Sequence, residues 1–228
     1  MSVPVLAASG LCREFPGGVH AVADVSFELQ PAEIVAITGP SGSGKSTLLS
    51  LLAGLLRPTA GEVWVNGTAL SGLSEGERAR LRRRELGFVF QSFNLVPVLS
   101  IAENVGLPQL LDGASEREIR PRVAEALAAV GLSHRAAHLP GAASVGEQQR
   151  AAIARALAGQ PRVLLADEPT GSLDRERGAA ILDLLELSRR TRGMSVILVT
   201  HDLEAAARAD RQLQMRDGRL CAPGGRSD

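Results

Sequence analysis

The alternation of hydrophobic and polar positions predicts strands in the N-terminal part of the chain. In DVSFEL, Val25, Phe27 and Leu29 alternate with polar residues, which is typical of a strand with one buried face. The segment GEVWVNG alternates in the same way through Val63 and Val65, and it ends in Asn-Gly, a hairpin-turn signal. We therefore expect a small antiparallel sheet here.

Four other segments are continuously apolar, and the chain between two of them is helical in pattern. Strands buried on both faces are typical of a parallel sheet covered by helices, and the four segments are EIVAITG, GFVFQ, RVLLADE and SVILVTH. The stretch from Ser100 to Leu139 has a helical pattern and few strand signals. The prediction is an α/β fold in one domain, residues 1–228, with a helical subdomain at about residues 95–160.

Composition narrows the class of protein only slightly. The 228 residues are 45% hydrophobic and 22% charged, as in an ordinary globular protein, and the net charge of zero gives no indication of nucleic-acid binding. The N-terminus MSVPVLAASG does not resemble a signal peptide, and LLSLLAGLL is shorter than the roughly 20 residues that span a bilayer. We expect an intracellular chain that reaches a membrane only through a partner.

The sharpest motif is GPSGSGKST, which lies between the apolar strand IVAIT and a helical pattern. It matches GxxxxGK[ST], a phosphate-binding loop in which backbone amides surround phosphate oxygens. Lys45, the only lysine in the chain, is predicted to reach the β and γ phosphates, and the Ser46 hydroxyl to ligate Mg²⁺. The motif therefore predicts a P-loop NTPase core, with phosphate contacts from Gly39, Pro40, Ser41, Gly42, Ser43, Gly44, Lys45, Ser46 and Thr47.

Polar residues at the ends of three apolar strands complete this predicted site. Asp167 and Glu168 follow VLLA; Asp167 is predicted to hold Mg²⁺ through water, and Glu168 to orient or deprotonate an attacking water. His201 follows SVILVT and is predicted to contact the γ-phosphate. Gln91 ends GFVFQ just before the helical stretch, so it could sense Mg²⁺ and the water and link nucleotide state to that subdomain.

A second anion-binding pattern occurs in SVGEQQRAAIARAL, where Ser144 and Gly146 begin a predicted helix. Together, these motifs resemble the ATP-binding subunit of ATP-binding-cassette (ABC) transporters, from about Leu11 to His201. They occur in the order of that family, and SVGEQQR followed by DEPTGSLD is highly specific to it. The resemblance implies an ATPase that converts ATP and water to ADP and phosphate.

The resemblance also implies a head-to-tail dimer. Ser144, Gly146 and Glu147 of one cassette would cap the γ-phosphate held by the other, and Asp174 would lie along the interface. A homodimer or a heterodimer is possible. By the same resemblance, Phe15 would stack on adenine with Val22 beside the base.

The family further implies an integral membrane permease as partner and a peripheral location on the cytoplasmic face of the inner or plasma membrane. The segment RRRELGFVFQSFNLVP resembles the branch that serves lipoprotein release and macrolide efflux, which suggests export. In that branch, residues 93–95 would border the groove for a helix of the permease. The alternative is a regulatory or mechanotransmitting ATPase that acts on an envelope partner without moving cargo.

One motif departs from the family pattern. LSGGQ or LSGGE is usual at the signature, whereas this chain has ASVGE, with Ala143 and Val145 at the first and third positions. Valine retains its amide donor, but its branched side chain adds bulk near a phosphate and disfavours positive φ. We therefore expect a weakened cap and slow ATP turnover by the isolated protein.

Overall fold

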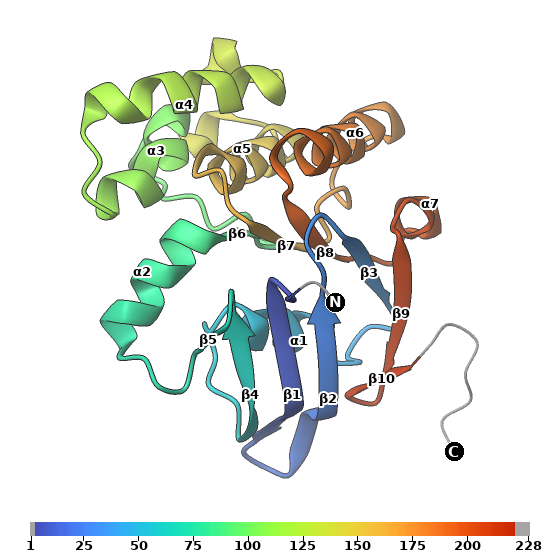
Figure 1. The fold of residues 1–228 in the computed structure, drawn as a ribbon. Helices are drawn as coiled ribbons and strands as arrows, with labels where there is room; N and C mark the ends of the chain where they lie inside the picture. Colours follow the sequence, from blue (N-terminus) through green and yellow to red (C-terminus); the bar gives the residue numbers. More distant parts are fainter. Residues whose placement is uncertain (1–2, 222–228) are drawn as a thin grey trace.

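The computed structural model describes residues 3–221 and contains two β-sheets (Figure 1). The predicted antiparallel sheet is confirmed, with Val25, Phe27 and Leu29 buried and their polar neighbours exposed. Asn66 and Gly67 form the predicted turn, with φ of 48° and 76°. The strand order is β2-β1-β4-β5, formed by β1 (Leu6–Phe15), β2 (Val19–Leu29), β4 (Ala60–Val65) and β5 (Thr68–Ala69).

The four continuously apolar segments form neighbouring parallel strands of the second sheet, as predicted. Two strands that the sequence did not predict extend it, one parallel to β3 and the last antiparallel. The order is β10-β9-β3-β8-β7-β6, formed by β3 (Ile34–Thr38), β6 (Leu86–Val89), β7 (Val163–Asp167), β8 (Ser195–Val199), β9 (Arg211–Arg216) and β10 (Arg219–Cys221).

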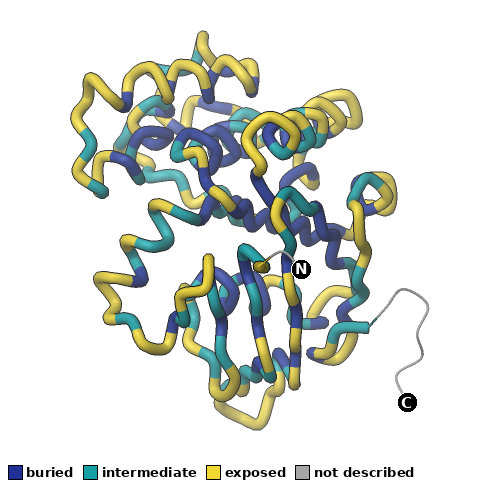
Figure 2. The backbone as a smooth tube through the Cα atoms, viewed as in Figure 1, coloured by how far each residue is buried: buried dark blue, intermediate teal, exposed yellow. Residues whose placement is uncertain are grey.

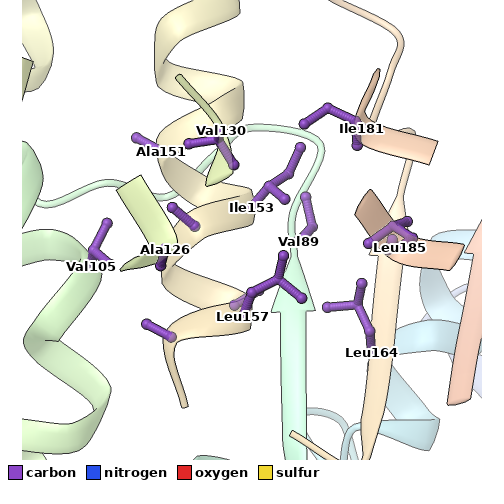
Figure 3. Packing of buried hydrophobic residues seen from close by; sticks show 14 of the residues in the cluster. Val89, Val105, Ala126, Val130, Ala151, Ile153, Leu157, Leu164, Ile181 and Leu185 are labelled. Atoms are coloured by element: carbon purple, nitrogen blue, oxygen red, sulfur yellow. The ribbon is translucent and has the colours of Figure 1, made fainter. Parts of the chain in front are cut away.

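The parallel sheet separates two hydrophobic cores because successive side chains of a strand face opposite ways. Leu165 and Ile197 pack with the helix α1 (Lys45–Leu52) and the antiparallel sheet. Leu164 and Val196 face the other core, which is covered by helices within residues 101–158 and 175–207 (Figure 3). Buried residues are concentrated in these strands, as Figure 2 shows.

Helices fill the chain between β6 and β7. They are α3 (Ile101–Leu111), α4 (Glu116–Ala129) and α5 (Val145–Ala158), with short 3₁₀ turns at Ser133–Arg135 and Pro140–Ala142. Together they lie above the parallel sheet in Figure 1. The other helices are α2 (Glu75–Glu85), α6 (Arg175–Arg192) and α7 (Leu203–Ala207). Within residues 3–221, no helix is both long and apolar enough to span a membrane.

Candidate functional site

A cavity of about 640 Å³ lies where the carboxyl ends of the parallel strands meet, which is where open α/β sheets bind ligands. It brings together residues from the phosphate loop, β6, β7 and β8 that are far apart in sequence. The predicted residues that line it are Gly39, Ser41, Gly42, Gly44, Lys45, Ser46, Thr47, Gln91, Asp167, Glu168 and His201.

The phosphate loop requires glycine at two positions, because a Cβ at either one would clash with the main chain of a neighbouring strand. Gly44 has φ of 104°, and a Cβ there would lie 2.0 Å from the carbonyl oxygen of Ala21. A Cβ on Gly39 would lie 2.1 Å from a main-chain oxygen of Met215. The loop therefore packs directly against two strands, and its backbone is held in place around the Lys45 side chain.

Lys45 places its ammonium at the centre of the loop. Its Nζ donates to the carbonyl oxygens of Gly39 and Pro40, each at 2.8 Å, and to Ser43 Oγ at 3.4 Å. Pro40 and Ser43 do not line the cavity; they contact the lysine instead. The arrangement concentrates positive charge where the loop amides converge, as binding of a polyphosphate requires.

Asp167 is a buried carboxyl group at the end of β7. Only 6% of the residue is exposed, and burial raises the pKa of its carboxyl, with the charge of Glu168 adding to the rise and a hydrogen bond with Ser46 opposing it. Ser46 and Gln91 line the same cavity. These three side chains offer hydroxyl, carboxylate and amide oxygens, which are the donors that Mg²⁺ prefers.

Glu168 turns its carboxylate into the cavity because its backbone leaves the strand with φ of 50°, a left-handed value that is uncommon outside glycine. Its Oε1 accepts from the main-chain N of His201 at 3.1 Å and lies 2.8 Å from the ring Nδ1. Thr200 Oγ1 donates to Oε2 at 3.3 Å. The hydrogen bond to Glu168 and its charge raise the pKa of His201, whose side chain is exposed.

Six further residues line the cavity that were not predicted from the sequence: Val19, His20, Ala21, Gln149, Gly171 and Ser172. Gln149 is the most informative, since it is only 1% exposed and its Oε1 accepts from Ser172 Oγ at 3.2 Å. It joins α5 to the loop that follows Glu168. Both residues could have been found from the sequence, because Gln149 lies in the QQR triplet and Ser172 lies in GSLD, and both motifs had been noted.

Neither Val22 nor Phe15, the two residues predicted to contact the adenine base, lines the cavity. Val22 is 1% exposed within the core under the antiparallel sheet, so the prediction that it packs beside the base is wrong. Val19, 58% exposed, lines the cavity instead. Phe15 pairs across the sheet with Val19 but does not line the cavity; Arg13 stacks on its ring at 4.7 Å. Stacking of Phe15 on adenine stays a prediction.

The start of α5 does not line the cavity of its own chain. Ser144 is the N-cap: its Oγ accepts from the Glu147 amide at 3.3 Å, and its own amide donates to the Glu147 carboxylate at 2.8 Å. That bond, supported by Arg135, lowers the pKa of Glu147 to about 2. The amides of Val145 and Gly146 precede the first intrahelical hydrogen bond, so within the described chain they are free for an outside acceptor.

Asp174 and the α5 start are neighbours although they lie apart in sequence. A Cβ on Gly146 would lie 3.4 Å from Leu173 Cδ2, next to Asp174. Asp174 is the N-cap of α6, accepting from the Arg177 amide at 2.9 Å. Like Ser144, Gly146 and Glu147, Asp174 does not line the cavity. The predicted interface residues therefore lie together on a surface apart from the chain's own phosphate loop.

Val145 does not strain the helix start. It occupies the first helical position and is not among the described residues with positive φ, so the expected backbone conflict is absent. Its side chain is 58% exposed. Any effect of the substitution must therefore come from the bulk of the isopropyl group beside the two free amides.

Comparisons with known proteins show the family to which the chain is similar. A family model described as ABC transporter matches residues 22–171. The cassette MJ0796 has been solved in a dimeric post-hydrolysis state bound to ADP and Pi; it is 37% identical, covers 97% of this chain and 100% of its own, and has a TM-score of 0.90. CbiO1 from Clostridium perfringens, part of the cbiONQ complex, is 30% identical, with coverages of 96% and 87% and a TM-score of 0.82.

Proposed function

Because the chain belongs to the family of ABC transporter ATP-binding domains, we propose that it energises a separate membrane permease through ATP-driven dimerisation. The chain itself is an ATPase that converts ATP and water to ADP and phosphate. The proposal places it peripherally on the cytoplasmic face of the inner or plasma membrane. CbiO1, a relative in a transporter complex, supports this assignment.

ATP is proposed to bind with its phosphates in the loop formed by residues 39–47. Lys45 would exchange its loop acceptors for β- and γ-phosphate oxygens, while the loop amides hydrogen-bond the same phosphates. Val19, which lines the cavity and pairs with Phe15 across the sheet, marks the side proposed for the adenine. Direct support comes from the lining residues, which combine one ammonium group with a glycine-rich turn.

The oxygen donors next to the loop fit Mg²⁺. Ser46 and Asp167 line the same cavity, and the buried carboxyl of Asp167 has a raised pKa that a cation would counter. We propose that Ser46 ligates the ion directly, Asp167 through water, and Gln91 when the nucleotide is in place. When bound, the ion neutralises charge that develops on the phosphates during transfer.

Hydrolysis is proposed to use Glu168 to orient and deprotonate the attacking water. Its carboxylate lies in the cavity, and donors from Thr200 and His201 fix its position. The proton would pass to Glu168, while His201 would contact the γ-phosphate. Most of the acceleration would come from positioning and charge neutralisation, since phosphoryl transfer requires little covalent chemistry from the protein.

The observation that carries the dimer proposal is that the α5 start does not line the cavity of its own chain, although Gln149 further along the same helix does. Two free amides and a helix N-terminus form an anion site that the chain's own loop does not use. We propose that Ser144, Gly146 and Glu147 serve the γ-phosphate of a second cassette, with Asp174 along the same interface. The dimeric structures of MJ0796 support dimerisation of the cassette.

The permease is proposed to dock beside β6. A groove of about 170 Å³, here called the α3 groove, contains two aromatic rings, Phe88 and Phe90, with centroids 4.1 Å apart, together with Pro108 and Arg155. It lies next to residues 93–95, the predicted docking segment. The resemblance of that segment to export and envelope-remodelling members supports export as the direction.

Affinity purification of the tagged chain from detergent-solubilised membranes of its own cells tests the proposal. We expect an integral membrane protein to co-purify and to raise the ATPase rate, and Phe90→Ala to reduce its recovery without loss of ATP binding. If the tagged chain retains ATPase activity but recovers no membrane protein, the permease assignment is wrong. A recovered membrane protein with no transport activity in vesicles would favour the regulatory alternative.

A further inference from the structure

The turn that contains Gln91 ends in two residues with a left-handed backbone, of which Phe93 is the unfavourable one. Phe93 donates its amide to the Phe90 carbonyl at 3.1 Å and closes the turn around Gln91. Phe93 and Asn94 then have φ of 62° and 50°. A left-handed conformation is unfavourable for a bulky residue such as phenylalanine, so contacts from outside the turn must maintain it.

Arg155 on α5 supplies those contacts. Its Nη2 donates to the Phe93 carbonyl at 2.6 Å and its Nη1 donates to the Asn94 carbonyl at 2.5 Å. The planar guanidinium suits this two-pronged contact, and charge-assisted hydrogen bonds are stronger than neutral ones. Within residues 3–221, Arg155 forms no salt bridge, and burial lowers its pKa. Its charge is directed at these two carbonyls.

We propose that Arg155 is a positioning residue that holds the Gln91 turn to α5, so that Gln91 in one nucleotide site and the α5 start serving the other site move together. Ser144 and Arg155 belong to the same helix, about 16 Å apart at ~1.5 Å per residue. Arg155 also lines the α3 groove. An occupant of that groove therefore touches the residue that sets the Gln91 turn.

This inference rests on the proposed function only in one respect: that Gln91 contacts the nucleotide site of its own chain and the α5 start contacts that of the partner. The clamp itself is a property of the single chain and can be measured without nucleotide. The test uses Arg155→Met, which removes both donors, Arg155→Lys, which keeps the charge but not the fork, and Arg117→Met as control. Arg117 is an exposed arginine on α4, in the same helical region.

Hydrogen exchange of the full-length chain gives the first readout. In Arg155→Met we expect the amide exchange rates of residues 91–96 to rise at least tenfold, while the rates in β6 and α5 stay unchanged. In Arg155→Lys the rates of residues 91–96 should lie between those of Arg155→Met and wild type. Arg117→Met should match wild type. Exchange that is unchanged at residues 91–96, or raised throughout the helical region, would overturn the proposal, because Arg155 would then not act on this turn.

Steady-state ATP hydrolysis gives the second readout. We expect kcat of Arg155→Met to fall about tenfold, with the KM for ATP within twofold of wild type, because the phosphate loop is untouched. A parallel loss of kcat and ATP affinity, or a wild-type kcat, would overturn the positioning role. Failure of the wild-type chain to hydrolyse ATP would instead contradict the proposed function and leave the exchange result standing.

Discussion

At the scale of single residues, the pair formed by Glu168 and His201 is the most directly measurable feature. Glu168 raises the pKa of His201 above its ordinary 6.5. The pair therefore contributes stability that is fully present below pH 6.5 and is lost as pH rises through the raised pKa. The imidazole is thus poised to carry positive charge near the proposed γ-phosphate position.

An NMR titration of His201 in wild type and in Glu168→Gln measures this pair. We expect the pKa of His201 to fall toward 6.5 in the variant, because the amide cannot attract the imidazolium as a carboxylate does. Glu116→Gln, on the distant helix α4, is the control and should leave the titration unchanged. An identical His201 titration in wild type and Glu168→Gln would show that no such pair forms in solution.

Val145 also acts at the scale of one residue. Its exposed side chain lies beside the free amides of α5 without straining the backbone. If its bulk costs about 1 kcal/mol in the capped state, Val145→Gly should raise ATP turnover of the isolated chain about fivefold. Val145→Ala, which retains a Cβ but removes both methyl groups, should give a similar gain. Unchanged rates for both variants would refute slow turnover by steric bulk.

At the scale of elements, most of the fold was predictable, because the hydrophobic pattern of each strand indicates whether one or both of its faces are buried. The continuously apolar segments gave the parallel strands, and the alternating segments gave the antiparallel sheet. β9 and β10 were missed because RQLQMR is mostly polar and RLC is only three residues long. Their place beside β3 comes from tertiary pairing rather than from local pattern.

Val22 shows why side-chain direction was harder to predict than strand position. Strict alternation from Val25 places Val22 on the opposite face of β2. A bulge at Asp24, with φ of 54°, shifts the pairing so that Leu11 lies opposite Val25 and Arg13 opposite Val22. Val22 and Val25 are therefore both buried, and no local sequence signal marked the bulge.

The candidate site was predictable in its motifs but not in the contacts between them. The phosphate loop, Asp167, Glu168, Gln91 and His201 each follow a strand, so a parallel sheet brings them to one edge. Contacts such as those of Gln149 with Ser172 and of Arg155 with the Gln91 turn join helices to loops over long sequence separations. They depend on how α5 packs on the sheet.

The N-cap of α5 provides a test at the scale of one helix. Ser144→Ala should cost about 0.5–2 kcal/mol of unfolding free energy through loss of the cap, measured by urea denaturation. Ser100→Ala is the matched control, since Ser100 and Glu103 form the same capping box on α3. Both should destabilise the chain, but only Ser144→Ala should weaken ATP-dependent dimerisation. Equal dimerisation of the two variants would contradict a role for Ser144 at the partner's nucleotide.

At the scale of the whole molecule, the chain has a cavity suited to a nucleotide and, outside the lining of that cavity, a helix start suited to a terminal phosphate. Bringing the two together within one chain would require α5 to leave its packing between β6 and the helices α3 and α4. A second chain can do so with both folds intact. The account therefore requires nucleotide-dependent association.

Light scattering of Glu168→Gln with saturating Mg-ATP measures that association most directly. We predict a mass of twice the 23.9 kDa of the chain, because the bound ATP is not hydrolysed and holds the two cassettes together. Adding Lys45→Ala to this variant should restore the monomer by removing the phosphate contact. A Glu168→Gln protein that binds Mg-ATP yet keeps the mass of one chain, even with its permease present, would contradict the account.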